Sequence, residues 1–185
     1  MSNRLKLSTA YCQGSALNLS HRILAVIFLA AGLMASEVSF AGKPIKVGDT
    51  APDWILSNSQ NESTSFYRDT PNSKSVILFW ATWCPYCKAL MPELERLRTE
   101  INDPTLKFYA LNIWEDGDPV GFLKENQYNF ALMLNADKVA KRYKVNGTPG
   151  LFVIDENKKI IYKRNKGEKP SDVYAAIHKL LSTTP

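Results

Sequence analysis

Two cysteines, Cys84 and Cys87, stand in a Cys-Pro-Tyr-Cys motif directly after an apolar run, Val76–Trp80. A short β-branched and aromatic run of this kind predicts a buried strand. Apolar residues then follow on one stripe at helical spacing: Leu90, Leu94, Leu97 and Ile101. We therefore expect a helix over residues 84–101. Both cysteines would lie at a strand-to-helix junction, with Cys84 at the helix start and Cys87 about one turn inside.

This position favours redox chemistry. The first turn of a helix carries unpaired N–H groups and the positive end of the helix dipole, and both stabilise a thiolate, the reactive form of cysteine. We assign Cys84 as the attacking nucleophile and Cys87 as the resolving thiol. Attack by Cys84 on a partner's disulfide would form a mixed disulfide, which Cys87 would then break. The assignment requires that Cys84 be reachable from solvent.

Two other uses of a cysteine pair fit less well. A zinc site needs further ligands, but beyond residue 41 the chain has no other cysteine and one histidine, His178. A structural disulfide between Cys84 and Cys87 would close so short a loop that it would remove little unfolded-state entropy. The pair itself is therefore the expected redox group, and we expect no metal and no other cofactor.

Several motifs together resemble a known superfamily. Residues 80–87 read WATWCPYC, Pro92 lies in the following helix, and Gly147-Thr148-Pro149 comes later in the chain. With the opening VGDTAPDW at residues 47–54, this pattern is similar to the thioredoxin superfamily, and within it to the TlpA/ResA-like cell-envelope thiol-disulfide oxidoreductases. The resemblance covers nearly all of the chain after residue 41.

The resemblance implies an α/β fold: a thioredoxin-like three-layer sandwich with a central mixed sheet, an N-terminal β-hairpin extension and a helical insertion. The apolar patterns agree with this layout, because strands and helices alternate along the chain. The expected strands are 54–56, 75–81, 106–114, 131–134, 150–155 and 159–163. The expected helices are 84–101, 118–127, 136–145 and 171–181.

The resemblance also implies a second half of the site. The Thr148–Pro149 bond would be cis, which would turn the Thr148 main chain toward Cys84, where it could pair with an extended client segment. Trp83 would lie at the rim, either contacting clients or as a half-buried surface tryptophan, and both interpretations stay open. Tyr86, between the cysteines, would tune the redox potential and the shape of the surface.

One departure from the resembled proteins concerns the proton of the resolving thiol. Thioredoxin has a buried Asp where this chain has Leu78, and the ResA branch has a Glu where this chain has Leu90. Glu115, just past the expected strand 106–114, is the candidate proton acceptor by topology. The alternatives are that Glu115 is a solvated loop acid and that water accepts the proton.

The N-terminus has the order of a secretory signal peptide. Basic residues precede an apolar block, Ile23–Ala35, and Ser39-Phe40-Ala41 offers small residues at the positions that a signal peptidase reads. We expect residues 1–41 to be the signal peptide, residues 42–185 to be the thioredoxin-like domain, and the periplasm to be the location. An uncleaved membrane anchor stays open, although the block is shorter than a typical span.

The overall charge of the chain limits which classes of partner are expected. The 185-residue chain has a net charge of +5 and no basic run with interleaved aromatics, so nucleic acid is not expected. The expected partners are client proteins with thiols or disulfides and a membrane electron donor or acceptor. The favoured function is reduction of client disulfides, with cytochrome c maturation as the setting that the resemblance suggests. An oxidant or isomerase, a peroxidase and a non-catalytic client-binding module are the alternatives.

Overall fold

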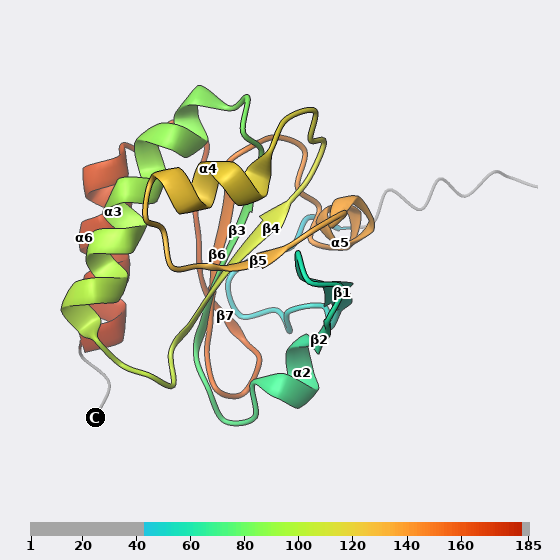
Figure 1. The fold of residues 1–185 in the computed structure, drawn as a ribbon. Helices are drawn as coiled ribbons and strands as arrows, with labels where there is room; N and C mark the ends of the chain where they lie inside the picture. Colours follow the sequence, from blue (N-terminus) through green and yellow to red (C-terminus); the bar gives the residue numbers. More distant parts are fainter. Residues whose placement is uncertain (1–42, 183–185) are drawn as a thin grey trace, which may run out of the picture. The chain divides into compact units, whose positions relative to one another are not determined.

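A computed structural model describes residues 43–182, and its centre is a mixed five-stranded sheet in the order β5-β4-β3-β6-β7 (Figure 1). The central strand β3 pairs in parallel with β4 and antiparallel with β6. Strand β5 continues the parallel side, and β7 continues the antiparallel side. The strands are β3 (Ser75–Trp80), β4 (Lys107–Asn112), β5 (Ala131–Met133), β6 (Gly150–Ile154) and β7 (Ile160–Lys163).

The sequence of β3 explains its central place. All of its residues are buried, as a strand covered on both faces requires. Successive side chains point to opposite faces of the sheet, so Val76, Leu78 and Trp80 enter one hydrophobic cluster, and Ile77 and Phe79 enter the other. The sheet is therefore the middle layer of a sandwich.

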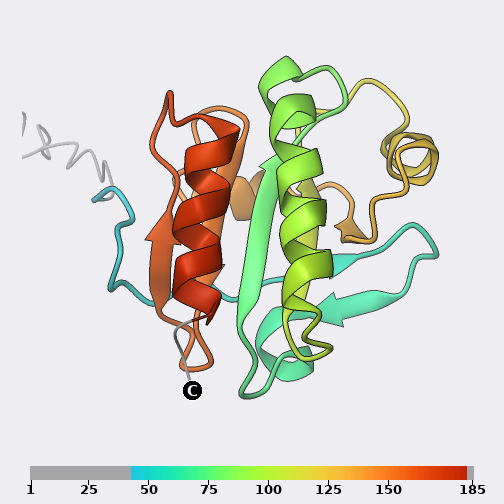
Figure 2. The same cartoon turned by 90° about the vertical axis from the view of Figure 1, so that its left-hand side faces the viewer.

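The face of the sheet that carries Val76, Leu78 and Trp80 is covered by two helices that lie side by side, α3 (Pro85–Ile101) and α6 (Pro170–Ser182) (Figure 2). The short helix α4 (Pro119–Glu125) adds Leu123 to the same cluster. Helix α3 begins directly after Cys84 and continues through Pro92. Along the chain, α4, β5 and α5 follow one another between β4 and β6.

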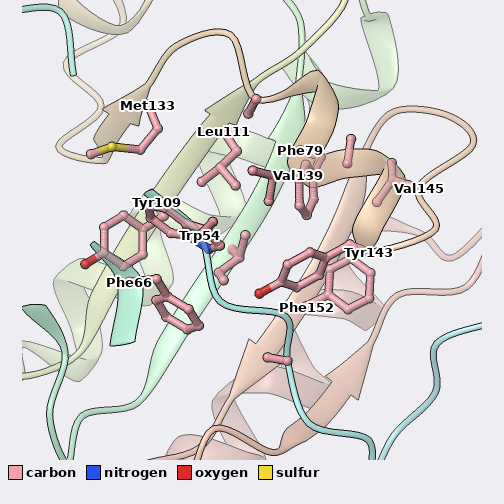
Figure 3. Close-up of a cluster of buried hydrophobic side chains, with 14 of the residues drawn as sticks. Trp54, Phe66, Phe79, Tyr109, Leu111, Met133, Val139, Tyr143, Val145 and Phe152 are labelled. Atoms are coloured by element: carbon pink, nitrogen blue, oxygen red, sulfur yellow. The ribbon is translucent and has the colours of Figure 1, made fainter. Parts of the chain in front are cut away.

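The second face is covered by α5 (Asp137–Arg142), α2 (Phe66–Asp69) and the hairpin of β1 (Ile55–Ser57) and β2 (Ser63–Ser65). Figure 3 shows the aromatic cluster beneath them. Trp54, directly before β1, stacks on Phe66 with ring centroids 5.2 Å apart and meets the edge of Tyr109. These contacts fix the hairpin to the sheet. The predicted sandwich, mixed sheet and N-terminal hairpin are confirmed, whereas α2 was not expected.

The predicted signal peptide, residues 1–41, lies outside the described residues. Within residues 43–182, no helix combines the length and the apolar character needed to cross a bilayer.

Candidate active site

Helix α3 positions the cysteine pair. Cys84 is its N-cap residue, with extended backbone, and Pro85 follows in the first turn, where a missing N–H costs nothing. The N–H of Cys87 donates to the Cys84 sulfur over 3.3 Å. Both cysteines are free thiols. The two sulfurs are not bonded to each other here, and the Cys84 sulfur accepts one of the otherwise unpaired N–H groups of the helix start.

The two thiols differ in their surroundings. Cys87 is fully buried, and burial, followed by its hydrogen bond to Cys84, raises the pKa of the Cys87 thiol far above its ordinary value. Hydrogen bonds with the Ala81 main chain and the Thr148 side chain act in the opposite direction but do not outweigh burial. Cys87 thus keeps its proton until something nearby removes it.

Cys84 is more enclosed than a nucleophile at a helix start was expected to be. Only 2% of the residue is exposed, because it packs in the same hydrophobic cluster as Cys87. The requirement that Cys84 be reachable from solvent is therefore met only narrowly. A client sulfur can therefore reach only a small exposed part of Cys84.

The Thr148–Pro149 loop lies at the same end of the sheet as the cysteines. Its peptide bond is cis, Pro149 is buried, and Thr148 is half-buried. Gly150, the next residue, is paired with Phe79 near the end of β3, which leads to Cys84. Within residues 43–182, no main-chain group donates to or accepts from the Thr148 main chain. These groups remain able to pair with an incoming segment.

The predicted rim residues are both exposed, Trp83 at 48% and Tyr86 at 71%. The indole N–H of Trp83 donates to the carbonyl of Trp114 over 2.6 Å. Trp114 has a φ of 51° and is itself 41% exposed, and its N–H donates to Asp137. Trp83 is therefore held in one orientation beside a second exposed tryptophan, which the sequence did not suggest.

Glu115 was considered either a proton acceptor or a solvated loop acid, and its environment matches neither description closely. It is half-buried, and its carboxylate accepts hydrogen bonds from Thr82, Asn112 and the Gly117 main chain. Burial alone would raise the pKa of Glu115, but these hydrogen bonds outweigh it and lower the pKa to about 2. So low a proton affinity argues against Glu115 as the acceptor of the Cys87 proton, and its many partners argue against a merely solvated acid.

The positions where related proteins carry an acid are apolar here. Leu78 and Leu90 are buried in the cluster that contains both cysteines. Within residues 43–182, no group of His, Cys, Asp or Glu gathers as metal ligands would.

Comparisons with known proteins agree with this geometry. The model of the Redoxin family matches residues 46–177. The thiol-disulfide oxidoreductase ResA of Geobacillus thermodenitrificans is 31% identical over 144 residues, which are 75% of this chain and 80% of that protein. ResA of Bacillus subtilis is 28% identical over 142 residues, 75% of this chain and 79% of that protein.

A solved structure shares both fold and sequence. The putative thiol:disulfide interchange protein DsbE from Chlorobium tepidum superposes with a TM-score of 0.64 at 26% identity, covering 75% of this chain and 97% of that one. With two free cysteines at a helix start and a matched family model over most of the chain, the conclusion is that the chain belongs to the Redoxin family, as a TlpA/ResA-like thiol-disulfide oxidoreductase of the thioredoxin superfamily.

Proposed function

We propose that the protein reduces disulfides of client proteins in the periplasm and is then re-reduced by a membrane electron donor, with cytochrome c maturation as the setting. The observation that carries the proposal is the cysteine pair at the start of α3, where the Cys84 sulfur accepts the Cys87 N–H and Cys87 keeps its proton. Oxidoreductases of this family act on thiols and disulfides, so client proteins are the substrates.

The proposed reaction has two steps. The Cys84 thiolate attacks one sulfur of the client disulfide, forming a mixed disulfide and releasing the other client sulfur as a thiolate, which takes up a proton. Cys87 then loses its proton and attacks Cys84. The client leaves as a dithiol, and Cys84 and Cys87 are left as a disulfide, so two electrons and two protons pass to the client.

The partners of the two sulfurs support the proposed direction of electron flow. Strong oxidants of this superfamily have a greatly stabilised reduced form. Here the hydrogen bonds to the sulfurs come from the main chain and from the Thr148 hydroxyl, all uncharged groups. Uncharged donors stabilise a thiolate less than cationic side chains do. This favours a reductant over a disulfide-donating oxidant.

The second step has no dedicated base in the proposal. Leu78 and Leu90 supply no carboxylate, and Glu115 binds protons weakly. Water accepts the Cys87 proton, and we expect the mixed disulfide to resolve more slowly than it would with a buried carboxylate as the base.

The test combines three measurements on the purified domain. Insulin reduction in the presence of dithiothreitol and consumption of hydrogen peroxide are followed in parallel, and the Cys84–Cys87 reduction potential is determined. We expect insulin to precipitate rapidly, peroxide to remain, and the potential to lie near the reducing end of the superfamily range, about −270 mV rather than −120 mV. A potential at the oxidising end would indicate an oxidant or isomerase instead. Peroxide consumption would indicate a peroxidase, and inactivity in both assays a client-binding module.

The proposed location rests on the apolar block Ile23–Ala35 and the small residues that follow it. Expression of the full chain in a bacterium, followed by fractionation and N-terminal sequencing, tests it. We expect a periplasmic protein that begins near Gly42. Recovery of the intact chain from the membrane fraction would instead establish an uncleaved anchor.

A further inference from the structure

A groove of about 330 Å³ borders the Thr148–Pro149 loop. Its walls come from residues 144–152, which include this loop and the first residues of β6, and from the end of β7 and the residues just after it. Four cationic side chains line it, and none of its described lining residues is acidic: Lys144, Lys163, Arg164 and Lys166. Among residues 43–182, none of these four forms an ion pair. The groove therefore has a concentrated positive charge.

Two of the cations are held in place without being neutralised. Lys163 donates to the carbonyl of Ile45 and Arg164 to the carbonyl of Glu168, each over 2.8 Å. Main-chain carbonyls carry no net charge, so both side chains remain positive. The carboxylate of Glu168 interacts electrostatically with Arg164, but it accepts its hydrogen bonds from Tyr162 and Asn165.

One donor of the groove is left without a partner. The Nε of Arg164 is buried and reaches no acceptor among the described residues. A buried donor without an acceptor is costly, and this nitrogen leaves the charge of the Arg164 side chain only partly compensated by hydrogen bonds. Lys144 and Lys166, in contrast, are exposed and offer mobile charge at the edge of the groove.

The groove lies where a client would pass. Strand pairing places Gly150 beside Phe79, and the N–H of Arg164 donates to Leu151, so the groove and the end of β3 share one end of the sheet. A client segment that pairs with the free Thr148 main chain, with its sulfur at Cys84, would extend toward this groove. Each further residue of an extended segment advances about 3.3 Å.

We propose that this groove binds acidic side chains of the client segment next to the target cysteine. The inference rests on the proposed function and names its preferred substrates: disulfides flanked by Asp or Glu. Carboxylates form charge-assisted hydrogen bonds with Arg and Lys, and the same charges speed the encounter of an acidic client with the site. Both effects weaken as salt screens the charges.

The test uses two peptides, each closed by one disulfide and identical except that glutamates flank the cysteines in one and glutamines in the other. Rates of reduction are measured for the wild type and for the double variant Lys144→Gln/Lys166→Gln, at low and at high salt. A matched control is Lys107→Gln/Lys159→Gln, which removes the same charge from exposed lysines at the start of β4 and just before β7, at the other end of the sheet.

We expect the wild type to prefer the acidic peptide at low salt and the groove variant to reduce it about threefold or more slowly, with the neutral peptide unaffected. The control variant should keep most of the preference. Equal losses in the two double variants, or equal wild-type rates for the two peptides, would overturn the inference.

A binding measurement separates this inference from the proposed function. Peptides with serine in place of cysteine are titrated into the protein, and amide resonances are followed by NMR. The acidic peptide should shift Asn146, Gly147 and Lys166 in the wild type and much less in the groove variant. If the wild type reduced neither disulfide peptide, the proposed function would fall, and these shifts alone would decide for or against the groove.

Discussion

The carboxylate of Glu115 accepts hydrogen bonds from both the N–H and the hydroxyl of Thr82, over 2.9 and 2.5 Å, although 33 positions separate the two residues. Thr82 lies in the loop between β3 and α3, two residues before Cys84, and Glu115 follows β4. This one side chain therefore ties together two loops at the end of the parallel strands. It holds the turn that leads the chain into the N-cap of α3.

The first prediction concerns the charge of Glu115. The pKa of Glu115 is lowered to about 2 in the folded protein, so its contribution to stability is present above its ordinary pKa of 4.5 and is lost as the pH falls toward 2. We expect Glu115→Gln to lower the free energy of unfolding by about 1–2 kcal/mol at pH 7, less than the full pKa shift would imply, because solvent screens this half-buried charge. The difference from wild type should shrink between about pH 5 and pH 2.

Urea unfolding at several pH values measures this difference, with Glu125→Gln as the control. Glu125 is an exposed acid of α4, so its replacement should change stability little. A Glu115→Gln effect that did not depend on pH, or an equal effect of Glu125→Gln, would show that the Glu115 charge does not hold the two loops.

The second prediction separates the two interpretations of Trp83. Trp83→Phe keeps a large aromatic ring but removes the N–H that donates to Trp114, and Trp83→Ala also removes the exposed ring. If Trp83 contacts clients, both variants should reduce protein disulfides more slowly, Trp83→Ala the more so, while reduction of a small disulfide changes little. Stability should fall by about 1 kcal/mol in Trp83→Phe. Equal losses with protein and small substrates would contradict client contact.

The third prediction concerns the accessibility of the two thiols. Cys87 is fully buried and protonated, whereas Cys84 keeps a narrow opening to solvent. Iodoacetamide should therefore label Cys84 in the reduced, folded protein and leave Cys87 unlabelled, as read by mass spectrometry of the digested protein. In denaturant, both should react. Labelling of Cys87 at the rate of Cys84, or no labelling of Cys84 in the folded state, would be incompatible with the assigned roles.

The fourth prediction restores an acid near the resolving thiol. Leu90→Glu places a carboxyl one turn after Cys87, in an apolar cluster. We expect a loss of about 3 kcal/mol in stability at pH 7 and a smaller loss at lower pH, because burial raises the pKa of the new carboxyl and the neutral form is cheaper to bury. The mixed disulfide should resolve faster, because Cys87 gains a proton acceptor.

Leu90→Gln is the matched control, since it disturbs the packing without supplying a base. Resolution is followed by the decay of a mixed disulfide between Cys84 and a reporter thiol. Equal rates in Leu90→Glu and Leu90→Gln would mean that proton transfer from Cys87 does not limit this step.

Local patterns in the sequence were sufficient to predict most of the fold. The fully apolar strand Ser75–Trp80 and the stripe of leucines in α3 each follow one period, and such periods depend on neighbours only a few positions apart. The motif at residues 84–87 was enough by itself to predict redox chemistry of Cys84 and Cys87. Helix α2 was missed because it has only a single turn and is fixed by tertiary packing of Phe66 on Trp54.

The supporting contacts of the site could not be predicted in the same way. The bond from Trp83 to Trp114 and those from Thr82 to Glu115 join residues more than thirty positions apart, and they depend on how two loops meet. Glu115 was singled out for its place after β4, but the hydrogen bonds that lower its pKa come first from Thr82 on another loop and then from Asn112 and Gly117. The cationic groove likewise combines side chains from before β6 with others at and after the end of β7, and no sequence motif marks it.

The most direct test of the central claim, that Cys84 attacks and Cys87 resolves, is the capture of mixed disulfides in cells. Full-length Cys87→Ala and Cys84→Ala variants are expressed, thiol–disulfide exchange is quenched with acid, and adducts are separated on non-reducing gels. The account predicts client adducts on Cys87→Ala that disappear with dithiothreitol, and none on Cys84→Ala. Equal adducts on both variants, or adducts on Cys84→Ala alone, would contradict it.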